Sequence, residues 1–265
     1  MSEKVIYLDD EATWPEAVLA VLTAQFSELA KYEAERTRLD KLSQGGDMNI
    51  RLNRPMNPHG GAYEQTLSEI AAGIASKHLA GYHGTRLHTD EIADILKNGM
   101  RPLSPELLAE RVTRRRDAGD ISPNIATRLL SEHQGNDENR AKMIWFAFDR
   151  AALRDEWGFI RLFSSWGGEA LYCGHEEDDE TGPVLRAIGE PCIIEAAVPI
   201  DSIETFCEVA RRFYDMYMSC RNVSTTHGPG MEGYVTHALP VRRIIRVSEA
   251  EFERLTNFSA WDKPS

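Results

Sequence analysis

Residues 1–80 carry their apolar side chains mainly at helical spacing. Between residues 13 and 43 the apolar positions return every three or four residues, which predicts one long amphipathic helix. These positions are Val18, Leu19, Val21, Leu22, Phe26 and Leu29. The stretch 47–62 is rich in Pro, Asn and Gly and is expected to form a loop. A second helix is predicted after it, over about 63–79.

From Gly81 onwards, short apolar runs alternate with stretches that open on helix-capping residues. Strands are predicted at 82–87, 142–149, 168–174, 191–200, 233–240 and 242–247. Helices are predicted to begin at the caps Thr89, Ser104-Pro105 and Ser122-Pro123, and further helices near 150–165 and over 202–218. Asn98-Gly99 is expected to end the first of these helices.

The irregular order of these elements indicates an α+β fold. Strands and helices do not alternate regularly, and the last two strands are adjacent, which favours a split, mostly antiparallel sheet with flanking helices. We divide the chain into an N-terminal helical extension, residues 1–80, and a main domain, residues 81–265. No G-x-G-x-x-G follows a strand and opens a helix, and G-x-x-x-x-G-K-[ST] does not occur, so Rossmann and P-loop nucleotide sites lack support.

Net charge argues against a large nucleic-acid footprint. The 265 residues carry a formal net charge of -12, whereas nucleic-acid-binding surfaces are normally basic. The densest basic stretch, Arg111 with Arg114–Arg116, is interpreted as a solvated helix face. The acidic run HEEDDE at 175–180 is interpreted as a solvated loop, with a divalent-cation site as the alternative.

Cysteine usage and the absence of long apolar runs bear on the compartment. The four cysteines form no C-x-x-C pair, which predicts reduced thiols rather than a disulfide frame or a zinc site. The N-terminus is acidic and has no apolar signal core. No uninterrupted apolar run approaches the roughly 20 residues that cross a bilayer. We therefore expect a cytoplasmic protein that does not engage membranes.

Several motifs of the main domain occur in a suggestive order. These are YHGTRL with IADILKNGMRP, then MIWFAF, then CIIEAAVP, and finally MEGYVTHALPVRRII. Together they resemble the ADP-ribosyltransferase superfamily over about residues 81–247. In that superfamily the first strand carries His-Gly-Thr or His-Gly-Ser, a middle strand is aromatic, and a late strand begins at a glutamate. The resemblance implies the corresponding fold, with the N-terminal helices as an addition to it.

The resemblance also implies which residues of the first and middle strands bind NAD. His83 corresponds to the histidine that holds a ribose of NAD, and Gly84 would offer its backbone groups to the nicotinamide carboxamide. Thr85 would support that geometry, and Trp145 stands in the place of the family's aromatic. An imidazole and a backbone amide that fix the ribose and the carboxamide contribute by orientation, and an aromatic face stacks on nicotinamide.

Glu232 corresponds to the catalytic glutamate of the late strand. A carboxylate near the ribose stabilises the oxocarbenium-like centre that forms when nicotinamide leaves. Gly233 follows Glu232 where the family continues with apolar residues, so a bulge at Gly233 is needed to keep the carboxylate on the usual face. The run FSSWGGEALY at 163–172 adds Ser164, Ser165 and Tyr172 as further pocket candidates, because its glycines permit a close backbone approach.

The function that the resemblance implies is transfer of ADP-ribose from NAD to a macromolecule, protein or nucleic acid. NAD is then a substrate, no metal is expected, and a bacterial toxin or defence-type effector is suggested. A regulatory protein or a second copy of the chain is a candidate partner for the N-terminal helices. Two alternatives remain open: an RNA 2'-phosphotransferase-like enzyme, to which Arg86, Arg101 and Arg140 would supply phosphate contacts, and a catalytically inactive binding domain of the same fold.

Overall fold

A computed structural model describes residues 4–44, 55–150, 157–226 and 230–248. The chain divides into two compact units. The first comprises residues 1–79, 199–201 and 205–231, and the second comprises residues 80–198, 202–204 and 232–265. The first division thus falls between Leu79 and Ala80, one residue before the boundary that the sequence suggested, and the chain later re-enters the first unit.

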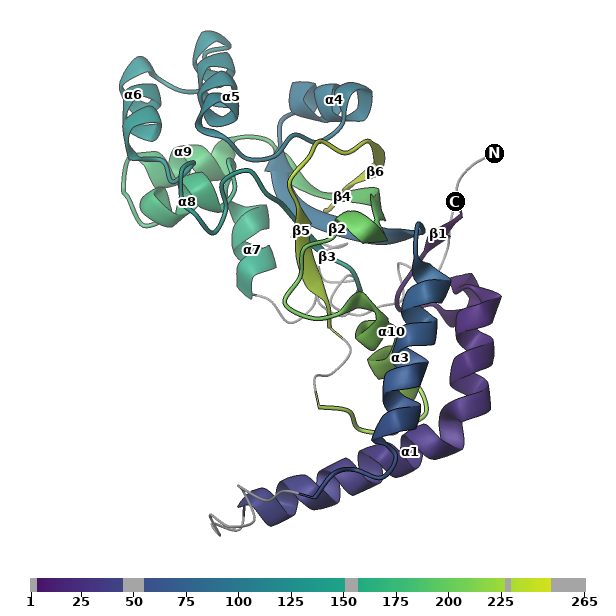
Figure 1. Ribbon diagram of the computed structural model, residues 1–265. Coiled ribbons are helices and arrows are strands. Elements are labelled where there is room, and N and C mark those ends of the chain that lie inside the picture. The colour runs from purple at the N-terminus through teal and green to yellow at the C-terminus, as the bar shows by residue number, and fades with distance from the viewer. Residues whose placement is uncertain (1–3, 45–54, 151–156, 227–229, 249–265) are drawn as a thin grey trace. The chain divides into compact units, whose positions relative to one another are not determined.

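Helices form most of the first unit (Figure 1). They are α1 (Glu16–Gln44), α3 (Gly60–Ile74) and α10 (Val209–Ser219), which contact one another. The apolar positions that predicted the long helix hold this packing, since Val18, Leu22 and Leu29 are fully buried. The short strand β1 (Val5–Ile6) pairs in parallel with the first two residues of β2 (His78–Leu87).

Two predicted helices of this unit are shorter than expected. The helix predicted to reach residue 79 ends at Ile74, because Ser76 takes a positive φ of 58° and β2 begins at His78. The helix predicted over 202–218 begins only at Val209 and belongs to the helical unit rather than to the main domain. Its aromatic side chains decide this placement, because Phe213 packs 4.8 Å from Trp14 and the hydroxyl of Tyr214 lies 2.6 Å from a Glu33 oxygen.

A mostly antiparallel sheet forms the centre of the second unit, which confirms the α+β class. Its strands run in the order β5 (Glu232–Val235), β3 (Ile144–Ala147), β2, β4 (Glu190–Pro199) and β6 (Val241–Arg246). The pairings β2–β3, β3–β5 and β4–β6 are antiparallel. In the described part of β2 and β3, their pairing consists of Tyr82 with Ala147 alone.

Six helices flank this sheet in the described part of the second unit (Figure 1). They are α4 (Thr89–Asn98), α5 (Pro105–Asp117), α6 (Pro123–Glu132), α7 (Trp157–Ser164), α8 (Glu169–His175) and α9 (Thr181–Ala187). Ser104 and Ser122 cap α5 and α6 as predicted, each accepting a backbone N–H with its hydroxyl oxygen. The cap of α4 is His88 rather than Thr89, in a capping box with Glu91.

The strand predicted at 168–174 is wrong, because this segment is helix α8. A short apolar run cannot by itself distinguish a buried strand from a buried helix turn. Gly167 and Gly168 both have positive φ, 95° and 69°, and Gly168 is the N-cap from which the helix starts. Leu171 then packs into a cluster with side chains of α5, α6 and α9. The two glycines therefore begin a helix instead of admitting a ligand to a strand.

The acidic run at 175–180 is more than a solvated loop. His175 ends α8 and is buried, and Asp178 accepts both hydrogen bonds from Arg128 and the backbone N–H of Thr181. Helix α9, which the sequence pattern did not predict, begins directly after this turn. The run thus joins two helices and ties them to α6 through Arg128.

His175 gives this part of the second unit a pH-dependent stability. Its Nδ1 lies 3.1 Å from the Thr181 hydroxyl oxygen, while its Nε2 has no hydrogen-bond partner among the described residues. Burial, with the charge of Arg128, lowers the pKa of His175 from 6.5, although the nearby carboxylates of Glu132 and Asp178 act in the opposite direction. Protonation therefore favours the unfolded chain.

We expect the second unit to lose stability as the pH falls below about 6.5. Between the lowered pKa of the folded state and the ordinary value, the unfolded chain binds more protons, so acid shifts the equilibrium toward it. Urea denaturation at about pH 7.5 and about pH 5.5 measures the difference, and the His175→Asn variant should show a smaller one. The exposed His237 offers a control, since H237A should keep the dependence of the parent. Equal pH dependences in H175N and the parent would contradict this origin.

The state of the cysteines and the length of the apolar helices both bear on expectations from the sequence. All four cysteines are free thiols, and burial raises the pKa of Cys192 to about 11. In the part of the chain that the structure describes, no helix combines the length and the apolar character needed to span a membrane.

Candidate functional site

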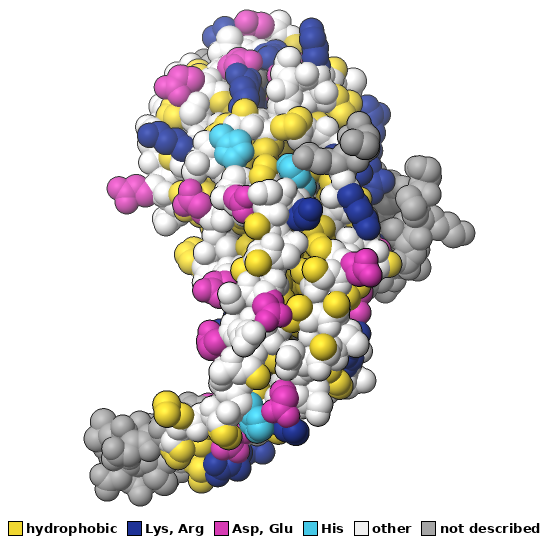
Figure 2. All heavy atoms as spheres, turned by 45° about the vertical axis from the view of Figure 1, so that its right-hand side comes forward, with side chains coloured by type: hydrophobic (Ala, Val, Ile, Leu, Met, Phe, Trp, Pro, Cys, Tyr) yellow, Lys and Arg dark blue, Asp and Glu magenta, His cyan; other side chains and the backbone are white. Residues whose placement is uncertain are grey.

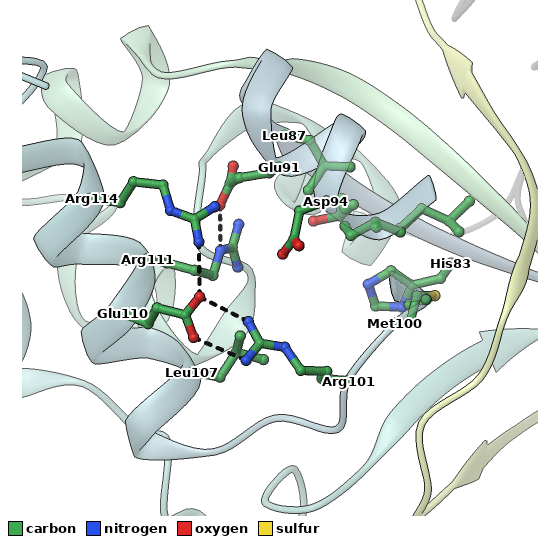
Figure 3. A pocket seen from close by; sticks show the side chains of 14 residues that line it. His83, Leu87, Glu91, Asp94, Met100, Arg101, Leu107, Glu110, Arg111 and Arg114 are labelled. Atoms are coloured by element: carbon green, nitrogen blue, oxygen red, sulfur yellow. Dashed lines mark hydrogen bonds and ion pairs between the residues drawn. The ribbon is translucent and has the colours of Figure 1, made fainter. Parts of the chain in front are cut away.

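A pocket of about 110 Å³ opens in the second unit next to His83 (Figure 3). Its walls come from β2, β4, α4, α5 and the turn at 99–101 that leads from α4 toward α5. His83, Thr85 and Leu87 line it from alternate positions of β2, so that they share one face of the strand. Side chains of both charges complete the walls from the two helices.

The turn at 99–101 is fixed by a strand-like bridge to a distant segment. Met100 and Leu239 exchange backbone hydrogen bonds, with N···O distances of 2.7 and 3.0 Å. Gly99 precedes the bridge with a φ of 81° and a ψ of 177°, a region that is essentially reserved for glycine. This geometry turns the chain out of α4 and presents Arg101 to the rim of the pocket.

The imidazole of His83 is oriented by a backbone carbonyl. Its Nδ1 lies 2.8 Å from the carbonyl oxygen of Trp145, which only accepts, so Nδ1 carries the proton and Nε2 is left as an acceptor. The bond lies next to the Tyr82–Ala147 pair that joins β2 to β3. Burial, with the positive charge of Arg111, lowers the pKa of His83 despite the opposing effect of the bond to Trp145. The ring is therefore a neutral hydrogen-bond acceptor near pH 7.

A buried carboxylate anchors the inner wall of the pocket. Glu91 accepts hydrogen bonds from Arg111 Nε at 2.6 Å, from the indole Nε1 of Trp166 at 2.8 Å and from the backbone N–H of His88 at 2.8 Å. The guanidinium of Arg111 also lies over the Trp166 ring, 4.8 Å from its centroid. Burial acts to raise the pKa of Glu91, but the Arg111 charge and these hydrogen bonds outweigh it and hold the pKa below its ordinary value.

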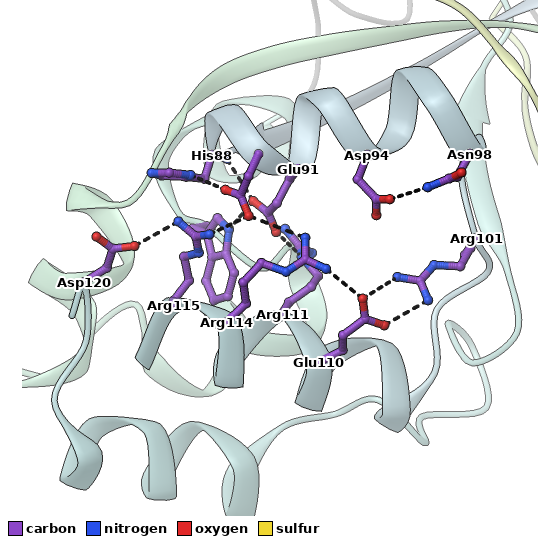
Figure 4. Close-up of polar contacts among 12 residues, drawn as sticks. His88, Glu91, Asp94, Asn98, Arg101, Glu110, Arg111, Arg114, Arg115 and Asp120 are labelled. Carbon is purple, nitrogen blue, oxygen red and sulfur yellow. Dashed lines mark hydrogen bonds and ion pairs between the residues drawn. The ribbon is translucent and has the colours of Figure 1, made fainter. Parts of the chain in front are cut away.

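A second carboxylate joins two arginines at the rim (Figure 4). Both carboxylate oxygens of Glu110 accept hydrogen bonds from the guanidinium of Arg101, at 2.9 and 3.2 Å. One of these oxygens also accepts a hydrogen bond from Arg114 at 2.8 Å. Arg114 reaches Asp90 as well, at 3.4 Å, and Asp90 in turn accepts from the buried Arg115 at 2.6 Å. The pocket thus combines an imidazole nitrogen that can accept a hydrogen bond with arginine donors suited to an anion.

The residues that the sequence suggested around His83 are divided between the pocket and other places. Thr85 lies in the pocket with His83, whereas Gly84, between them in β2, does not line it. The indole of Trp145 packs against Tyr234, with ring centroids 4.8 Å apart, and does not line the pocket. The carbonyl oxygen of Trp145 is the group that bonds the His83 ring.

The side chain of Glu232 lies on the same face of the sheet as Tyr82, not on the face of His83. It pairs with Ala147 of β3, which pairs with Tyr82 of β2, and the pairing of residues 144–147 with 232–235 is uninterrupted at Gly233. Because neighbouring residues of a strand face opposite sides, the Glu232 and His83 side chains leave the sheet on opposite faces, with their strands roughly 10 Å apart. The pocket lining includes His83 and not Glu232.

Three further candidates lie outside the pocket lining. Ser164 is exposed at the end of α7, and Ser165 is buried behind it. Tyr172 is fully buried on α8, where its hydroxyl lies 3.3 Å from a Glu169 oxygen. Their serine and tyrosine hydroxyls therefore do not meet His83 in this structure. The loop at 227–229, next to Glu232, lies outside the described residues.

The charged residues of α4 and α5 were missed as site residues. The basic stretch was interpreted as a solvated helix face, yet Arg115 is buried and Arg111 and Arg114 line the pocket. Two sequence features would have helped. Arg111 and Arg114 lie on the face of α5 that also carries Glu110, and a buried tryptophan such as Trp166 requires an acceptor for its indole N–H.

Of the arginines considered for phosphate contacts, Arg101 alone lines the pocket. Arg86 donates to the carbonyl oxygens of Ile188 and Phe163, and Arg140 pairs with Glu169. Among the described residues, no group of three or more His, Cys, Asp or Glu side chains is arranged to hold a metal ion. On the face shown in Figure 2, acidic and basic side chains are interspersed.

Comparison of the chain with models of protein families, with curated proteins and with solved structures finds nothing that matches.

Proposed function

We propose that the second unit is an ADP-ribosyltransferase that takes NAD as its substrate and passes ADP-ribose to a macromolecular acceptor. The observation that carries the proposal is the placement of His83. Its protonated Nδ1 is held by the carbonyl oxygen of Trp145 and its ring lines a pocket. The strands that bear the motifs of the resemblance also follow one another in the sheet, in the order β5, β3, β2, β4 and β6.

In this proposal His83 positions the ribose that carries nicotinamide. Its Nε2 accepts a hydrogen bond from a ribose hydroxyl, and the lowered pKa keeps that nitrogen free of a proton near pH 7. When the glycosidic bond breaks, nicotinamide leaves with the bonding electrons and the ribose acquires oxocarbenium character. A nucleophilic oxygen or nitrogen of the acceptor then forms the new bond to the ribose carbon and gives up its proton.

The carboxylate that stabilises the oxocarbenium has two candidate sources. Glu232 serves if the ribose reaches the Tyr82 face of the sheet past the end of the β2–β3 pairing. Asp94 serves if the ribose stays in the pocket, where this side chain of α4 points inward and bonds the Asn98 amide (Figures 3 and 4). Comparison of E232Q with D94N distinguishes them, because only the substitution of the true source removes turnover.

Release of nicotinamide from NAD tests the proposal. We expect the parent protein to release nicotinamide in the presence of bacterial lysate or nucleic acid as acceptor, and H83A to do so roughly 10²-fold more slowly, because the ribose is no longer positioned. H237A removes an exposed imidazole and should match the parent. A melting temperature that rises with NAD in the parent and in H237A, and less in H83A, reports binding separately from turnover.

One observation favours a second candidate, an RNA 2'-phosphotransferase-like activity. Arg101, Arg111 and Arg114 line the same pocket, and guanidinium groups bind phosphate with paired hydrogen bonds. A 2'-phosphorylated RNA oligonucleotide added to the NAD assay distinguishes the two: loss of its 2'-phosphate supports this candidate, and ADP-ribosylation of other acceptors supports the first. A protein that neither consumes NAD nor is stabilised by it contradicts both and favours a binding domain.

A further inference from the structure

We propose that the rim of the pocket is a binding subsite for a phosphate-bearing ligand, and that the Glu110 carboxylate occupies this subsite in the present structure. The inference concerns Arg101, Arg111 and Arg114 and is independent of NAD cleavage. In this inference the Glu110 carboxylate competes with the ligand for the arginines, and a phosphate group displaces it.

The hydrogen bonds of Glu110 are those of a bound anion. Arg101 donates to both of its oxygens, and Arg114 donates to one of the same oxygens from the next turn of α5. Two guanidinium groups from separate segments thus surround one planar anion. Arginines recognise carboxylate and phosphate groups in this way. The side chains of Arg101, Glu110 and Arg114 are 46%, 42% and 35% exposed, so each pair is worth little and a stronger anion can replace the carboxylate.

Arg111 adds a donor that lacks an acceptor. Its Nε is bound to Glu91, but its Nη2 is buried and has no hydrogen-bond partner among the described residues. An unsatisfied buried donor is unfavourable, and an incoming oxygen atom would satisfy it. Arg111 lies one turn before Arg114 on α5 and lines the same pocket, whose arginines gather near Glu110 while His83 lies on the opposite side (Figure 3).

The size of the pocket is consistent with a partly blocked site. It measures about 110 Å³, which is smaller than the roughly 300–1,000 Å³ of small-molecule sites. Glu110 and Arg114 both line it, so movement of the Glu110 carboxylate away from Arg101 and Arg114 would enlarge it.

Charge favours a phosphate over a carboxylate as the displacing group. A phosphate brings up to two negative charges, a diphosphate brings two or more, and both offer more acceptor oxygens than the single carboxylate they replace. Other acids are present, because Asp90 shares Arg114 and Arg115 at the outer edge and Glu91 neutralises Arg111. With Glu110 moved aside, Arg101 has no other ion-pair partner among the described residues, so its guanidinium is available to a phosphate even though Asp94 also lines the pocket.

Calorimetric titration of the full chain with inorganic pyrophosphate, at constant ionic strength, tests the inference. We expect E110Q to bind pyrophosphate about tenfold more tightly than the parent, because loss of the competing charge frees both guanidiniums. E106Q is the matched control: it removes the same charge one turn earlier on α5, outside the pocket, and should leave the affinity unchanged. R114Q in the E110Q background should reverse the gain.

Equal affinity in E110Q and E106Q, or a gain that survives R114Q, would overturn the inference. E110D keeps the charge but is too short to bridge both arginines, and an intermediate gain is expected for it. ADP-ribose and 2'-AMP, titrated into E110Q, distinguish a diphosphate from a phosphomonoester as the preferred group. If the variants bind pyrophosphate as expected but the protein releases no nicotinamide, the subsite is supported and the proposed enzymatic activity is contradicted. If nicotinamide release depends on His83 but the variants do not show the expected pyrophosphate affinities, the activity is supported and the subsite is contradicted.

Discussion

The Glu91→Gln substitution is expected to lower the free energy of unfolding of the second unit by about 3–5 kcal/mol. Glu91 is 5% exposed. Its carboxylate accepts hydrogen bonds from Arg111, from the Trp166 indole and from the backbone N–H at the start of α4. Glutamine keeps the size but leaves the Arg111 guanidinium, which is 18% exposed, without its counter-charge. A buried charge that loses its partner is far more costly than a broken exposed pair.

Hydrogen exchange of the full chain under mild urea locates and measures this effect. Amides of α4, α5 and α8 should exchange faster in E91Q, while those of α1 and α3 in the first unit serve as an internal reference. E110Q is the matched control, since it also breaks arginine pairs of α5 but at an exposed position, and should cost about 1 kcal/mol or less. In the double variant E91Q/R111Q the loss should shrink, because no unpaired charge remains. A loss in E91Q no larger than in E110Q would show that Glu91 is dispensable.

Elements with strong local signals were predicted well from the sequence. Ser104-Pro105 and Ser122-Pro123 each begin a helix because the hydroxyl caps it and proline suits the first turn. The continuous apolar runs near 144–147 and 190–199 form buried strands of the sheet. These features depend on residues a few positions apart, which is the range over which a sequence pattern carries structural information.

The misses involve contacts between residues that are distant in the chain. Whether Leu171 belongs to a strand or a helix depends on the cluster it joins, whose other members come from α5, α6 and α9. Likewise, α10 joins the helical unit through Tyr214 and Glu33, which are 181 positions apart. Helical or strand periodicity reveals an apolar face but not its partner.

In the candidate site, too, the residue with a local signal was predicted and the residues brought together by long-range packing were not. His83 was singled out from its local setting, and the structure gives it a pocket and an orienting carbonyl. The groups that surround it, Glu91 and Arg111, looked like the ordinary first turn and charged face of two helices, and only the packing of α4 against α5 makes them a buried pair. The face taken by Glu232 depends on strand register, which a single residue inverts.

Gly99→Ala is expected to destabilise the second unit by about 2–6 kcal/mol, for two separate reasons. The backbone at Gly99 has φ 81° and ψ 177°, which strains any L-residue by about 1–3 kcal/mol. A β-carbon there would also press against the carbonyl oxygen of Leu239, the group that accepts the hydrogen bond of Met100. Relief of that clash requires the bridge to open, at a further cost typical of overpacking, about 1–3 kcal/mol.

Gly119 is a control without the steric contact. It has nearly the same φ, 85°, but a β-carbon at this position would meet no atom within 4 Å. G119A should therefore cost only backbone strain, about 1 kcal/mol. The difference between the two variants in urea denaturation measures the Leu239 contact together with the extra strain of the extended ψ at Gly99. Because the same bridge presents Arg101, G99A should also weaken pyrophosphate binding in the E110Q background while G119A does not. Equal losses of stability in the two variants would show that the chain leaves α4 without needing the close approach at Gly99.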